Sequence, residues 1–156
     1  ISSFAWGGVS SASSTTFTVI AGNTDIRNVN KSGDNYVAYC FAEVDGFSKF
    51  GSYTGNGSTD GPFVWCGFRP RYVLVKRTDS TGAWIVKDTA RDTGNQAVRN
   101  LYTNLTNAED TFATVELDIL SNGFKLRGAA TDQNASGGTY LFAAFAEAPF
   151  KYSRAR

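Results

Sequence analysis

Two glutamates at matching places in a repeated segment are the residues best suited to chemistry in this sequence. Glu43 ends residues 36–43 and Glu147 ends residues 140–147, and Tyr, Phe, Ala and Glu fall in register in the two copies. If the copies form neighbouring strands, the two carboxyl groups could act as the acid and base of a sandwich-fold glycoside hydrolase. The favoured interpretation is that each carboxylate is solvated or ion-paired where its strand leaves the core.

Other common catalytic and metal-binding constellations are missing. The chain has no His and only two Cys, which excludes the usual Ser-His-Asp and Cys-His nucleophiles and the common zinc sites. The glycine-rich residues 51–61 lack the spacing and the Lys of a phosphate-binding loop. We therefore expect no catalytic residue, cofactor or metal, although a calcium ion held by distant loops stays open. Cys40 and Cys66 are interpreted as small buried hydrophobic residues, with a disulfide between neighbouring strands left open.

Three aromatic residues are candidates for glycan contacts, because sugars bind to exposed aromatic faces with Asn and Asp nearby. They are Trp65, Trp84 and Tyr102. The apolar neighbours of the two tryptophans, Val64 and Ile85, favour core positions for them instead.

The elements that must position these residues are β-strands. The chain is 14% aromatic and contains 16 Gly but only 3 Pro, a composition typical of short strands joined by many turns. Residues 121–123 contain an Asn-Gly hairpin signal, and residues 97–105 could form one helical turn. The spacing predicts an all-β, antiparallel sandwich of jelly-roll type with little helix. About nine strands are expected, at residues 15–20, 36–43, 47–53, 62–66, 72–78, 83–87, 111–120, 124–127 and 139–147.

The domain organisation is expected to be simple. Residues 1–14 are rich in Ser and Gly and are interpreted as an arm or linker, and residues 15–156 as one sandwich domain. The arm would dock on a neighbour or form a terminal strand on its own sheet. A net charge of +1 gives no field that would recruit nucleic acid, and no apolar run is long enough for membrane insertion. The expected assembly contacts are Phe4, Trp6, Arg154 and Arg156.

Several separate motifs in this sequence occur in the order found in a known domain. They are residues 47–57, residues 67–70, residues 73–77, Trp84, residues 120–126 and residues 140–150. In these motifs the chain resembles a β-rich domain common at the C-terminus of tailed-bacteriophage virion proteins, sometimes after a concanavalin-like domain. The resemblance covers roughly residues 33–150.

The resemblance implies a non-enzymatic virion structural protein: a tail fibre or spike, a head fibre or a capsid decoration component. The implied partners are copies of itself, most often as a trimer, and other virion proteins, in a particle assembled in the host cytoplasm. The family offers no catalytic residue to carry over. A receptor- or glycan-binding module at a fibre tip is the alternative, and a sandwich-fold glycoside hydrolase is a remote one.

Overall fold

The chain forms two compact units in the computed structural model, which describes residues 8–20, 29–112 and 114–147. The first unit is Ile1–Phe41 and the second is Ala42–Arg156. The boundary along the sequence therefore lies between residues 41 and 42, whereas the arm was expected to end at residue 14. In the first unit, β1 (Gly8–Ala12) and β2 (Phe17–Ile20) form an antiparallel hairpin. Part of the expected arm is therefore a strand.

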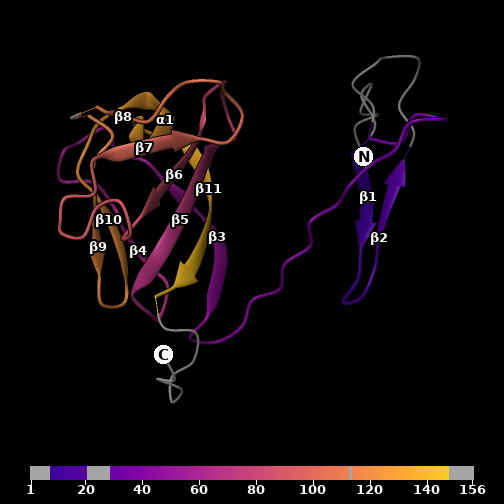
Figure 1. Ribbon diagram of the computed structural model, residues 1–156, viewed down its shortest axis with the longest axis horizontal. Coiled ribbons are helices and arrows are strands. Elements are labelled where there is room, and N and C mark those ends of the chain that lie inside the picture. The colour runs from indigo at the N-terminus through magenta and orange to yellow at the C-terminus, as the bar shows by residue number, and fades with distance from the viewer. Residues whose placement is uncertain (1–7, 21–28, 113, 148–156) are drawn as a thin grey trace. The chain divides into compact units, whose positions relative to one another are not determined.

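The second unit contains two antiparallel sheets (Figure 1). The larger sheet has the order β3-β11-β5-β6-β7-β8, and the smaller sheet has the order β4-β10-β9. The large-sheet strands are β3 (Ser48–Thr54), β5 (Pro70–Arg77), β6 (Trp84–Asp88), β7 (Arg99–Tyr102), β8 (Asp110–Thr111) and β11 (Thr139–Ala146). The small-sheet strands are β4 (Phe63–Trp65), β9 (Leu117–Leu120) and β10 (Gly123–Leu126).

The core of the second unit lies between these two sheets. In β11 the alternate residues Tyr140, Phe142 and Ala144 are buried, as expected when every second side chain points to the same face. They pack with β5 from the same sheet, and with β4, β9 and β10 from the other. Phe124 of β10 makes an edge-to-face contact with Phe142 at 5.6 Å between ring centroids. The all-β sandwich expected from the sequence is thus confirmed.

The strand expected at residues 36–43 is not formed, and this prediction was wrong. Residues 34–43 belong to no strand, and all of them are exposed. Cys40 lies in this stretch as an exposed free thiol, which corrects its interpretation as a buried residue, whereas Cys66 is buried and also free. The second copy, by contrast, forms the whole of β11. Strand propensity alone did not decide the outcome, because a strand also needs a neighbour for its hydrogen bonds.

The hairpin expected around Asn122 is present but shifted by one residue. Leu120 pairs with Gly123, so Ser121 and Asn122 form the loop and Gly123 begins β10. An added Cβ on Gly123 would lie 2.1 Å from the carbonyl oxygen of Val64. The glycine is therefore needed for the close approach of β4, not for the turn.

Three further segments differ from expectation. Residues 97–105 contain β7 in place of a helical turn, and the strand expected at residues 111–120 is regular only in β9 and at the end of β8. The one helix among the described residues is α1 (Thr131–Asn134), whose four residues follow β10. No helix in the described ranges is long and apolar enough to cross a membrane.

Candidate functional site

The two glutamates each bind a different cation at the surface. Glu43 accepts a hydrogen bond from Lys49 Nζ at 2.9 Å and another from the Phe50 amide at 3.1 Å. The Lys49 hydrogen bond, followed by the Phe50 amide, lowers the pKa of Glu43, whereas a general acid in a glycosidase requires a raised one. Glu147 is ion-paired with Arg69. This geometry supports the ion-paired interpretation of both residues and gives no support to an acid–base pair.

The four expected assembly contacts cannot be placed. Phe4, Trp6, Arg154 and Arg156 all lie outside the described residues.

The three candidate glycan contacts do not form one surface. Trp65 is 58% exposed and Trp84 is 41% exposed, so their interpretation as core residues was wrong. Trp84 precedes the buried Ile85 on β6 and therefore faces the opposite side of the sheet. Tyr102 of β7 pairs with Ile85 and packs on the same side of the sheet as Ile85, opposite to Trp84. Trp65 belongs to β4 of the smaller sheet.

Tyr102 is held in place by an acidic neighbour. Its hydroxyl donates a hydrogen bond to Asp110 Oδ2 at 2.9 Å. Burial, followed by this hydrogen bond, raises the pKa of Tyr102 to about 12. The phenol therefore connects β7 to β8 and remains protonated at physiological pH.

A cleft of about 380 Å³ opens between the outermost strands of the two sheets. It is lined by residues 49–53 of β3, residues 63–65 of β4 and Phe142 of β11. β3 and β4 are each the last strand of their sheet, so the cleft lies on the open side of the sandwich. We call it the β3–β4 cleft. Trp65 and Phe63, which are 58% and 45% exposed, lie along it.

The outer edge of β3 is covered only at its beginning. The Ser48 amide donates to the Val44 carbonyl at 2.9 Å, and the Phe50 amide donates to Glu43. The Ser48 hydroxyl donates to the Ala42 carbonyl at 2.9 Å and accepts a hydrogen bond from the Val44 amide at 3.0 Å. Side chains thus take the place of a continuing strand here, and no described strand pairs with the rest of the edge.

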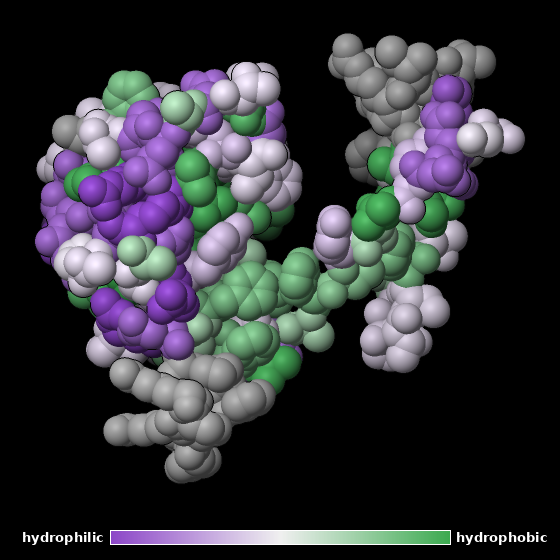
Figure 2. Space-filling model, in the orientation of Figure 1, coloured by the Kyte–Doolittle hydropathy of each residue, from purple (hydrophilic) through white to green (hydrophobic). Residues whose placement is uncertain are grey.

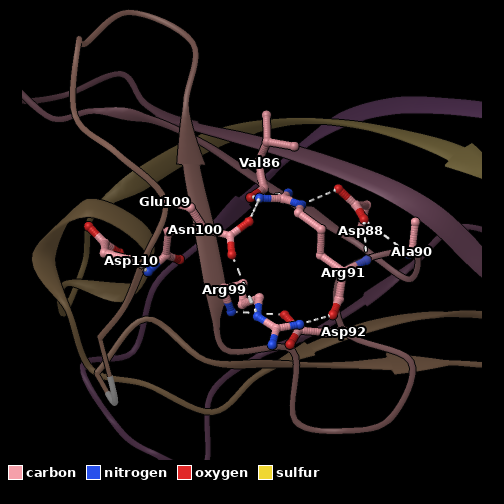
Figure 3. Close-up of polar contacts among 9 residues, drawn as sticks. All are labelled: Val86, Asp88, Ala90, Arg91, Asp92, Arg99, Asn100, Glu109 and Asp110. Atoms are coloured by element: carbon pink, nitrogen blue, oxygen red, sulfur yellow. Dashed lines mark hydrogen bonds and ion pairs between the residues drawn. The ribbon is translucent and has the colours of Figure 1, made fainter.

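A network of charged side chains organises the long connection after β6 (Figure 3). Arg91 binds Asp88 at 2.7 Å and Glu109 at 3.2 Å. The Arg99 amide donates to Asp92 Oδ2 at 2.8 Å, and the Arg99 guanidinium lies 3.6 Å from Glu109. Two arginines and three carboxylates are paired in this network, which connects the loop to Asp88 of β6 and Arg99 of β7. Within the described ranges, no group of three or more Cys, Asp or Glu could hold a metal ion.

These observations define an all-β, sandwich-type domain that carries the β3–β4 cleft. A family model described as a domain of unknown function, DUF7483, matches residues 2–149. The chain belongs to this family. No curated protein and no solved structure matches the chain.

The sequence did not point to the β3–β4 cleft. Its walls come from strands that are separated along the chain, and no local pattern indicates which strands end their sheets. The tryptophan exposure could have been inferred, since Trp65 follows the buried Val64 and must face the other way.

Proposed function

We propose that this chain is a non-enzymatic structural component of a bacteriophage virion that works through subunit assembly. Candidate locations are a tail fibre or spike, a head fibre or the capsid surface. The resemblance of residues 33–150 to phage virion domains supports a location in a phage particle. The exposed apolar surface described next supports a role in subunit assembly.

The observation that carries the assembly role is the exposure of residues 36–41, which we call the exposed segment. Val37 is 78% exposed, Tyr39 is 82% exposed and Phe41 is 66% exposed. Figure 2 shows hydrophobic residues gathered along this extended part of the chain. Contiguous apolar surface of this kind is typical of interaction sites in soluble proteins.

The open sheet edges support the same role. The outer edges of β3 and β4 carry few charged side chains and border an aromatic cleft. Natural proteins usually cover such edges, because they invite pairing with another chain. A neighbouring subunit would provide this cover.

The proposal is tested by locating the chain in purified phage particles from its source. We expect antibodies raised against the chain to label intact particles in electron micrographs, and mass spectrometry to detect it in fixed proportion to the major capsid protein. Detection in the free protein fraction alone would contradict a virion role. Turnover of any substrate by the purified chain would contradict the non-enzymatic part.

A receptor- or glycan-binding role is the second candidate, and it is favoured by the exposure of Trp65 beside Phe63 on the β3–β4 cleft. Exposed aromatic rings stack on apolar faces of ligands. If the cleft binds glycans, Trp65→Ala should remove binding on a glycan array and Trp84→Ala should retain it. Equal binding by both variants would exclude a glycan site in this cleft.

A further inference from the structure

The two copies of the repeat share their turn as well as their residue types. Gly33 and Gly137 both adopt left-handed backbone conformations, with φ of 86° and 74°. Each glycine is followed three residues later by Tyr36 or Tyr140, which begins the repeat. In the second copy the chain then enters β11, which pairs with β3 on one side and β5 on the other. The first copy has the same left-handed glycine and the same residue types, but it forms no strand.

The apolar side chains of the exposed segment provide enough surface for a stable interface. Aromatic side chains bury about 150–250 Å² each, and Tyr36, Tyr39 and Phe41 are 49%, 82% and 66% exposed, so together they offer roughly 300–500 Å². If two copies exchange this segment, the surface covered on both partners reaches the roughly 1,200–2,000 Å² of a stable protein–protein interface. Burial of this area is favourable, whereas its exposure in a lone subunit is not.

The outer edge of β3 offers the complementary surface. Backbone groups of alternate residues point to the same side of a strand, so the Ser52 amide faces away from β11 like those of Ser48 and Phe50. Residues 51–53 also form one wall of the β3–β4 cleft. A strand added here would hydrogen-bond to β3 and place alternate side chains against the aromatic lining.

The hairpin that leads into β3 within the second unit is short. A hairpin onto β3 begins at the bridge between Val44 and Ser48, and Gly46 in its turn has φ of 72°. It stops at once, because Glu43 occupies the Phe50 amide and the Ser48 hydroxyl occupies the Ala42 carbonyl. These side-chain contacts hold the hairpin short.

We propose that the exposed segment of one copy lies as an added β-strand along β3, in the β3–β4 cleft of a second copy. This inference rests on the assembly role proposed above and names its partner surface. It makes the interface directional, with a donated strand on one copy and a receiving edge on the other. The interaction is the addition of a β-strand to an exposed sheet edge.

The first test is sedimentation velocity of the full 156-residue chain over about 1–200 µM. We expect species whose masses are multiples of 16.8 kDa, and the fraction of the chain in these species should increase with concentration. Val37→Asp places a charge in the donated strand and should weaken association at least about tenfold. Val29→Asp is the control, since Val29 is 43% exposed and lies outside the exposed segment.

The receiving edge is tested by Ser52→Pro, which removes the outward amide without disturbing the pairing of β3 with β11. It should weaken association like Val37→Asp. Trp65→Lys is the second receiving-side variant if Ser52→Pro does not fold, because the exposed Trp65 side chain tolerates a charge. Cooperative thermal unfolding establishes that each variant is folded.

The decisive experiment mixes the two defective variants. Val37→Asp retains an intact edge and Ser52→Pro retains an intact strand, so an equimolar mixture keeps one of the two strand–edge pairs. It should form heterodimers at about 200 µM, more weakly than the wild-type chain associates, whereas neither variant alone should associate. A folded mixture that stays monomeric would overturn the inference. So would a wild-type chain that is monomeric at the highest concentration, or a Val37→Asp chain that associates like wild type. Labelling of phage particles despite any of these results would leave the proposed function standing and reject only this interface.

Discussion

β11 and residues 36–43 differ in environment far more than in sequence. Tyr140 in β11 is fully buried and stacks on Tyr53 at 5.1 Å between ring centroids. Tyr36, at the equivalent position, is 49% exposed. Both repeats begin after a left-handed glycine and end in Ala-Glu. The difference shows that residue pattern makes a segment able to form a strand, whereas hydrogen-bonded pairing with another strand decides whether it does so.

The largest effect is expected from removing the equivalent tyrosines. Tyr140→Ala should lower the free energy of unfolding by about 3–5 kcal/mol, because it removes a buried ring. It also leaves the Thr131 carbonyl and the Ala135 amide without their partner, the Tyr140 hydroxyl. Tyr36→Ala removes a ring that is 49% exposed and whose hydroxyl accepts a hydrogen bond from the Lys31 amide at 2.9 Å. Because this contact is local to the first unit, the unfolding of the second unit should change by less than about 0.5 kcal/mol. Chemical denaturation of both variants measures the difference, and equal losses would show that both repeats belong to the folded core.

The reaction rates of the two cysteines should show the same contrast between an exposed and a buried environment. Cys40 is exposed, while burial raises the pKa of Cys66 to about 12. Because the thiolate is the reactive form, we expect Cys40 to react with a disulfide reagent at least about 100-fold faster than Cys66 near pH 8. Cys40→Ser should remove the fast phase and Cys66→Ala should retain it. Two thiols of similar rate would contradict the assigned environments.

Replacing the two glycines that precede the repeats, Gly33 and Gly137, should give a smaller difference in unfolding free energy. An added Cβ would meet nothing within 4 Å at either position, so only the left-handed backbone opposes a side chain. Gly137 also donates to the Gly55 carbonyl at 2.9 Å, which ties its turn to the end of β3. Gly137→Ala should therefore cost about 1–2 kcal/mol of unfolding free energy. Gly33→Ala should leave the unfolding of the second unit unchanged within about 0.5 kcal/mol, and a similar loss there would place Gly33 in the same cooperative unit.

The smallest effect concerns the carboxylate that covers the beginning of the β3 edge. Since the pKa of Glu43 is lowered from 4.5 in the folded chain, its ion pair contributes stability above that pH, and this contribution is lost as the pH falls through the lowered pKa. NMR titration should show Glu43 titrating below 4.5, and Lys49→Met should raise its pKa. Glu43→Gln should reduce the acid dependence of unfolding slightly. An unchanged Glu43 titration in Lys49→Met would contradict the assigned ion pair.

Sequence patterns predicted the sandwich class well, because its strands depend on local alternation. β11 and the hairpin of β9 and β10 follow from alternating apolar residues and a turn signal. β7 was missed because its buried residue is polar: Asn100 is fully buried and donates to Asp110 at 2.8 Å. The pairing that buries Asn100 depends on a residue ten positions away, which strand propensity does not include.

The candidate site was predicted less well than the fold. The glutamates were named, but their partners Lys49 and Arg69 follow from the folded chain. The β3–β4 cleft requires knowing that β3 and β4 end their sheets, a property of the topology and not of either strand. The exposed segment was identified as a strand because its side chains suit one, but its sequence does not indicate which strand, if any, it pairs with.

Hydrogen–deuterium exchange of the wild-type chain tests the central claim most directly. We expect the amides of residues 139–146 to be protected at every concentration, as a central strand requires. Amides of residues 36–41 should exchange freely in dilute solution and become protected as the concentration rises and copies associate. Protection of residues 36–41 that is independent of concentration would place this strand on its own sheet, and exchange that stays fast in the associated state would remove it from the interface; either result contradicts the account.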